Sequence, residues 1–114
     1  MSALISALLH AVDRRDWPAL GDLVTPDVVY DRPGYPTIRG VDEWLTFYRM
    51  TRIVATGQHR LVRVLADDAQ GFCWGEFTGT TRGGQPVDVR FADWYAFRDG
   101  RVCQRRTFFY EPAI

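Results

Sequence analysis

One carboxylate in an otherwise apolar row constrains this chain more than any other feature of its sequence. Residues 87–97 alternate like a β-strand, one face of which would carry Val89, Phe91, Asp93, Tyr95 and Phe97. Because the other four side chains are apolar or aromatic, we expect this face, with Asp93, to be buried. A buried carboxylate is paired, protonated or chemically useful, since burial of a bare charge is costly. With the strand turned over, Asp93 would be exposed and the phenylalanines would face water.

The size and charge of the chain indicate one globular domain and few classes of partner. Its 114 residues fit a single domain over 1–114, and 46% hydrophobic with 14% aromatic residues can fill a core and line a cavity. The formal net charge is zero, so we expect no nucleic-acid and no membrane partner, which would call for a basic excess. Weak self-repulsion at zero net charge favours a homodimer.

The cysteines and the N-terminal residues indicate the compartment. Cys73 and Cys103 fall inside predicted strands, where cysteine usually acts as a small buried hydrophobe. Residues 1–9 lack the basic start of a signal peptide, so we expect a reducing, cytoplasmic compartment without a disulfide framework. No apolar stretch approaches the roughly 20 residues of a membrane span.

The first half of the chain predicts helices around a short strand. Residues 2–14 carry apolar side chains at helical spacing, and Asp16 can cap a second helix with Pro18 in its first turn. Residues 27–32 then form a short strand.

A third helix follows a loop at residues 35–40, which has room for a short strand at 37–39. The helix begins at Val41 or Asp42 and runs to about residue 54. We expect Gly57 to close it as a C-terminal glycine.

Beyond residue 58 the apolar period changes to two, which is typical of strands. We expect four strands in a meander, at residues 59–66, 70–81, 87–97 and 101–110. Glycines at positions 71, 75 and 79 indicate the bends of a strongly curved sheet. Helices packed on one face of an antiparallel sheet give an α+β fold.

Six short motifs in this order resemble one protein family. They are residues 17–23, 28–31, 38–40, 44–48, 77–80 and 91–102. Together they resemble the SnoaL-like and ketosteroid-isomerase-like members of the nuclear transport factor 2 (NTF2) superfamily. The resemblance implies a curved antiparallel sheet wrapped around three helices, forming a cone with a central apolar pocket. Because this fold hosts many chemistries, function has to be argued from the site.

The resemblance also implies three site residues. Asp31 falls where ketosteroid isomerases place their carboxylate base, and Tyr48 where they place a supporting pocket tyrosine. Asp93 falls where they place an acid that donates to the enolate oxygen, and where SnoaL-type cyclases place their acid/base aspartate. The isomerases' main oxyanion tyrosine corresponds to Ala7 or Leu8, neither of which can donate, and such a donor is worth about 10²–10³ in rate. The cyclase pattern therefore fits better.

Two carboxylates in one apolar pocket take different protonation states, because their charges repel. We expect Asp31, at a strand end, to be the ionised base and Asp93 the protonated donor or acid. Asp31 could instead be a turn residue bonded to its own backbone. If Arg105 points inward, it could pair with Asp93, keep it ionised and reverse these roles.

Aromatic residues predict the pocket walls, namely Trp44, Phe47, Trp74, Phe91 and Tyr95. Glu76 could enter the cavity or pair with an arginine outside it. His59 could touch the pocket rim or be exposed, and His10 is expected at the surface.

No motif points to a metal or an organic cofactor, because the histidines and cysteines lack ligand spacing and no phosphate-binding glycine loop opens a helix. The leading hypothesis is an acid/base enzyme, an isomerase or polyketide-cyclase-like lyase, acting on a hydrophobic oxygenated small molecule of secondary metabolism. Epoxide opening is one alternative, favoured if Arg105 bridges Asp93 and a second carboxylate. A non-catalytic module for ligand binding or dimerisation is the other, favoured if the protein's own Trp or Tyr side chains fill the cavity.

Overall fold

Two helices open the chain in the computed structural model, which describes residues 1–111. Helix α1 (Ser2–Asp13) buries an apolar stripe that includes Ile5, Leu8 and Val12. Helix α2 (Trp17–Asp22) begins as the sequence predicts, because the Asp16 carboxylate accepts a hydrogen bond from the backbone N–H of Ala19 at 3.1 Å. No helix of the described residues is long and apolar enough to cross a membrane.

The third helix is shorter than the sequence predicts. Helix α3 (Val41–Thr46) passes into a π-helical turn, η1 (Phe47–Thr51), and Arg52 is already extended. Gly57 does not close this helix, so that prediction is wrong. It lies within a strand, where an added Cβ would sit 2.1 Å from Cζ of Phe77, and its missing side chain makes room for that ring.

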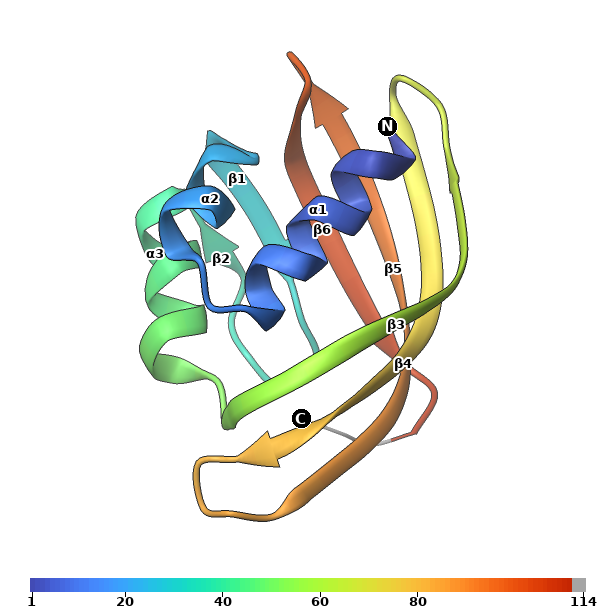
Figure 1. The fold of residues 1–114 in the computed structure, drawn as a ribbon. Helices are drawn as coiled ribbons and strands as arrows, with labels where there is room; N and C mark the ends of the chain where they lie inside the picture. The colour runs from blue at the N-terminus through green and yellow to red at the C-terminus, as the bar shows by residue number, and fades with distance from the viewer. Residues whose placement is uncertain (112–114) are drawn as a thin grey trace.

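The described residues form one six-stranded sheet (Figure 1). Its strands are β1 (Val24–Asp31), β2 (Ile38–Arg39), β3 (Val54–Ala66), β4 (Gln70–Thr81), β5 (Pro86–Arg98) and β6 (Arg101–Phe109). They lie in the order β2-β1-β6-β5-β4-β3. The α+β prediction is confirmed, with one refinement, since β1 pairs with β6 in parallel while the other neighbours are antiparallel.

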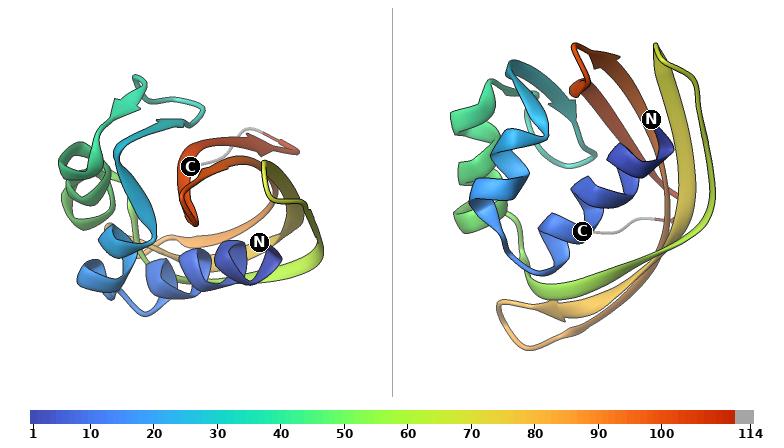
Figure 2. Two further views of the ribbon diagram at one scale, coloured as in Figure 1. Left: turned by 90° about the horizontal axis from the view of Figure 1, so that it is seen from above. Right: turned by 45° about the horizontal axis from the view of Figure 1, so that its top comes forward.

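The sheet is strongly curved, and helix α1 lies across its concave side (Figures 1 and 2). Strands β3 and β4 bend together at a bulge, where Leu61 pairs with Gly75 but Arg63 pairs with Trp74, leaving Val62 as the extra residue. Inward side chains of the sheet, the apolar stripe of α1 and buried residues of α2, α3 and η1 form the core.

Strand β5 has the register that the alternation predicts. Its inner face carries Phe91, Asp93 and Tyr95, all buried, and Asp93 is 1% exposed. The polar face of the strand lies outward, so the prediction that Asp93 is buried among aromatic side chains is confirmed.

Candidate functional site

Asp93 accepts hydrogen bonds from three buried side chains. The Tyr95 hydroxyl donates to its Oδ2 at 2.7 Å and the Thr107 hydroxyl to its Oδ1 at 2.6 Å. Arg105 donates to Oδ2 from Nη2 at 3.0 Å and from Nε at 3.2 Å. The register of β5 and β6 brings them together, because Asp93 faces Thr107 and Tyr95 faces Arg105. An ionised carboxylate, which only accepts, suits this set of donors better than the predicted protonated acid.

Arg105 connects this cluster to Tyr48. Its Nη1 donates to the Tyr48 hydroxyl, and its guanidinium lies 4.6 Å from the centre of the Tyr30 ring. Burial by itself would lower the pKa of Arg105, but Asp93 and the surrounding phenolic groups raise it well above its ordinary value. Burial also raises the pKa of Tyr48, against the influence of Arg105. Arg105 therefore stays charged and Tyr48 stays protonated.

Asp31 lies apart from this cluster. Alternation along β1 turns Tyr30 inward, where its hydroxyl lies 2.8 Å from that of Thr107, and turns Asp31 outward. The Asp31 carboxylate accepts from Thr37 at 2.7 Å and from Arg106 at 3.3 Å. The Thr37 hydrogen bond lowers the pKa of Asp31. The prediction that Asp31 and Asp93 share one pocket is therefore wrong.

Trp74 and Glu76 also point outward, because the inner face of β4 belongs to Cys73 and Phe77. Trp74 is 46% exposed, so its prediction as a pocket wall is wrong. Glu76 pairs with Arg60 on the outer surface at 2.6 Å, as in the second of its two predicted placements.

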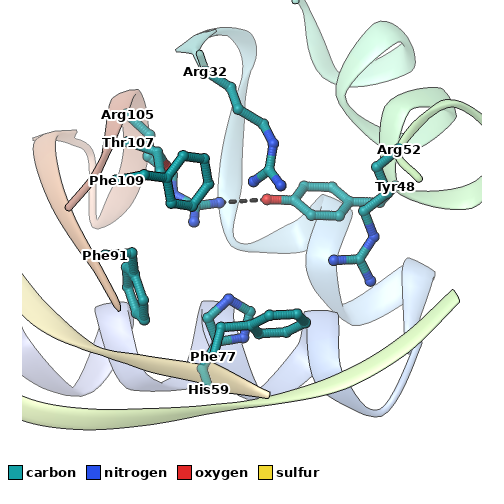
Figure 3. Close-up of a pocket in the computed structure, with 9 residues that line it drawn as sticks. All are labelled: Arg32, Tyr48, Arg52, His59, Phe77, Phe91, Arg105, Thr107 and Phe109. Carbon is teal, nitrogen blue, oxygen red and sulfur yellow. Dashed lines mark hydrogen bonds between the residues drawn. The ribbon is translucent and has the colours of Figure 1, made fainter. Parts of the chain in front are cut away.

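A narrow cavity lies on the inner side of the sheet, with about 320 Å³ of space between its lining atoms, mouth included. As it stands, it holds about one water molecule. Nine side chains of the described residues line it (Figure 3), namely Arg32, Tyr48, Arg52, His59, Phe77, Phe91, Arg105, Thr107 and Phe109. Of the other predicted walls, Trp44, Phe47 and Tyr95 are buried in the core but do not line it.

His59 lines this cavity, as in the first of its two predicted placements, and forms with Asp13 a second polar pair that the sequence did not predict. The Asp13 carboxylate accepts from the backbone N–H of His59 at 2.8 Å and lies 2.5 Å from its Nδ1. Burial lowers the pKa of His59, although Asp13 opposes that effect. A neutral ring that donates from Nδ1 to a carboxylate has its lone pair on Nε2. Figure 3 shows a ring nitrogen of His59 directed toward the space beneath Arg105 and Tyr48.

Two further arginines reach the cavity and were also missed. Arg32 is 8% exposed and lies 5.3 Å from the centres of the Phe47 and Phe109 rings. Arg52 is 3% exposed and lies 5.1 Å from the centre of the Tyr48 ring. Within residues 1–111, no three His, Cys, Asp or Glu side chains are grouped as metal ligands.

The family model described as a SnoaL-like domain matches residues 5–105 of this chain. The chain belongs to the SnoaL-like family. A comparison with curated protein sequences gives no match.

Solved structures share this SnoaL-like fold at low sequence identity. An NTF2-like protein of unknown function from Burkholderia pseudomallei has a TM-score of 0.84 and 21% identity over 94% of this chain and 88% of its own. An LEH-like epoxide hydrolase of M. tuberculosis has a TM-score of 0.83 and 21% identity over 95% and 80%. A protein provisionally named a polyketide cyclase, from Xanthomonas campestris pv. campestris, has a TM-score of 0.81 and 22% identity over 92% and 86%. Similarity at this level establishes the fold alone.

Proposed function

We propose that this SnoaL-like protein is an acid/base enzyme that uses its own side chains to move a proton next to a carbonyl group of a hydrophobic oxygenated small molecule. One observation carries the proposal. A neutral histidine held by Asp13 faces the same narrow cavity as the Arg105–Tyr48 pair. A base and an oxyanion site on either side of one space suit enolisation.

His59 is the proposed base. Asp13 holds both its backbone and its ring, which fixes the tautomer and leaves Nε2 as the acceptor. In the reaction, the C–H bond next to the carbonyl breaks and its proton passes to Nε2. The imidazolium that forms is stabilised by the carboxylate beside it.

Arg105 and Tyr48 are proposed to stabilise the other product of that step. The electron pair of the broken C–H bond moves to the carbonyl oxygen and gives an enolate. Tyr48 accepts from Arg105, so its own hydroxyl hydrogen is free to donate to this oxygen. Where the enolate is conjugated with a carbon–carbon double bond, return of the proton from Nε2 to the far carbon of that system would isomerise the substrate. Where the substrate has a second carbonyl group, attack of the enolate carbon would close a ring, and the proton on Nε2 would pass to the alkoxide that forms.

Asp93 is a positioning residue in this proposal, because its carboxylate is saturated by Tyr95, Thr107 and Arg105 and does not line the cavity. It holds the guanidinium of Arg105 in place. The epoxide alternative has less support, since Arg105 contacts only one carboxylate among the described residues.

A binding module without catalysis is a second candidate, and the narrowness of the cavity favours it. Tyr48 and the arginines occupy much of the interior, so a substrate requires these side chains, or Phe109, to move. A binding module would take up a ligand without speeding any proton transfer.

Deuterium uptake separates the two candidates. The aromatic ketone 2-tetralone would be incubated with the protein in D₂O, and proton NMR would follow the signal of the hydrogens next to its carbonyl. We expect faster exchange with the protein than without it, and loss of most of that acceleration, about 10²-fold or more, in His59→Gln.

His10→Gln is the matched control, because His10 is exposed on α1 and should exchange like the parent protein. Equal exchange with the parent and with His59→Gln, both folded by circular dichroism, would overturn the proposed function.

A further inference from the structure

The guanidinium of Arg52 is a buried cation that makes no ion pair with any described residue. It is 3% exposed, yet among residues 1–111 its side chain makes no ion pair and donates no hydrogen bond, and its Nε is buried without a partner. Its guanidinium lies 5.1 Å from the centre of the Tyr48 ring. Buried charges are normally paired, because desolvation of a lone charge is costly.

The carboxylates near this cavity are committed elsewhere. The Asp93 carboxylate accepts two hydrogen bonds from the guanidinium of Arg105, and the Asp13 carboxylate is bonded to His59. Among residues 1–111, no carboxylate lines the cavity, whereas Arg32, Arg52 and Arg105 all do. Burial lowers the pKa of Arg52, and the influence of Tyr48 and of the Asp13 carboxylate opposes that effect only in part. Arg52 therefore offers this cavity a buried donor that no described carboxylate engages.

We propose that the cavity binds the carboxylate of a small organic acid and that Arg52 is the group that recognises it. A guanidinium offers a planar pair of donors that fits a carboxylate in bidentate fashion. The inference rests on the proposed function, because it names the substrate class of the same site.

The remaining lining defines the rest of the ligand. Phe77, Phe91 and Phe109 supply apolar surface for a body of one ring. With its carboxylate on Arg52, such an acid brings a carbonyl group toward Arg105 and Tyr48, which face the same space (Figure 3). The substrate class is thus a small keto acid, in which one anionic group anchors the molecule and another oxygen reacts.

The test uses benzoate and its neutral isostere benzamide as probes, with acetate and 2-naphthoate as smaller and larger carboxylates. Isothermal titration calorimetry on the parent protein should give saturable binding of at least one carboxylate, and benzamide should bind about 30-fold more weakly than benzoate or worse. Arg52→Met should lose carboxylate binding by a similar factor. Arg60→Gln is the matched control and should bind as the parent does, because Arg60 lies on the outer surface with Glu76.

Arg52→Met should also fold, with an unfolding temperature equal to or above that of the parent, because it removes an unpaired buried charge. No binding of any of the three carboxylates to the parent, or equal binding of benzoate to the parent and to Arg52→Met, would overturn the anion site. The two proposals fail separately. Loss of benzoate binding in Arg52→Met supports the anion site whether or not 2-tetralone exchange depends on His59.

Discussion

The carboxylate of Asp93 and the guanidinium of Arg105 form an ion pair of 3.0 Å in which the two side chains are 0% and 2% exposed. They lie on adjacent strands, β5 and β6, and Arg105 pairs with Tyr95, two residues from Asp93. The pair fixes the position of Arg105, whose remaining amino group reaches Tyr48. A structural ion pair thereby orients the group that we propose to act on the substrate.

Asp93→Asn should destabilise the fold strongly. Loss of one partner of a buried pair leaves an uncompensated charge and typically costs about 3–5 kcal/mol. Urea denaturation followed by tryptophan fluorescence measures this. Asp88→Asn, at an exposed position of the same strand, should change stability by less than about 0.5 kcal/mol. Equal stability of the two variants would mean that the ion pair contributes nothing to the fold.

Strand alternation is the part of the site that the sequence could predict. A period of two in residues 87–97 placed Asp93 inward, and the same period put Arg105 on a face with Thr107. Alternation along β1 turns Tyr30 inward and Asp31 outward. The prediction that Asp31 lies in the pocket came from the family resemblance and not from this alternation. Local periodicity was the better guide wherever a strand was long enough to have one face buried.

Contacts between distant elements could not be predicted. His59 and Asp13 lie 46 residues apart on a strand and a helix, and no local pattern joins them. Arg52 follows a helix that was predicted to run to about residue 54 and to be closed by Gly57, whereas the π-helical turn ends it at Thr51. His59 and Arg52 line one cavity because the tertiary fold brings β3 and the end of η1 together, and no local pattern predicts that.

Tyr48→Phe should slow 2-tetralone exchange by about 10²–10³-fold, the usual effect of losing one oxyanion donor. Substrate affinity should change little, because the aromatic ring remains. Tyr35→Phe is the control, since Tyr35 packs on Phe47 and does not line the cavity. Full activity of Tyr48→Phe would mean that this hydroxyl takes no part in the reaction.

The outer face of the sheet should form a homodimer interface. Phe72, Trp74 and Phe108 lie there side by side around one groove and are 54%, 46% and 53% exposed. Such an apolar patch is typical of an interaction surface, and a second copy of the chain is the partner that we propose.

Light scattering after gel filtration should give a dimer mass for the parent and a monomer mass for the double variant Trp74→Glu/Phe108→Glu. Met50→Glu, which alters an exposed apolar residue elsewhere, should stay dimeric. A monomeric parent would contradict the proposal.

The exchange rate should depend on pH through His59. Only the neutral ring is a base, so the rate should rise with pH, and because burial lowers the pKa of His59, the midpoint should lie below its ordinary value of 6.5. Asp13 raises this pKa against burial, so Asp13→Asn should move the midpoint to still lower pH. The same change should slow exchange, because the ring loses the carboxylate that orients it.

NMR exchange rates from about pH 4.5 to about 8 measure both effects. Asp68→Asn, in an exposed turn, should keep the parent profile. A midpoint above 6.5, or one that Asp13→Asn leaves unchanged, would mean that another group is the base.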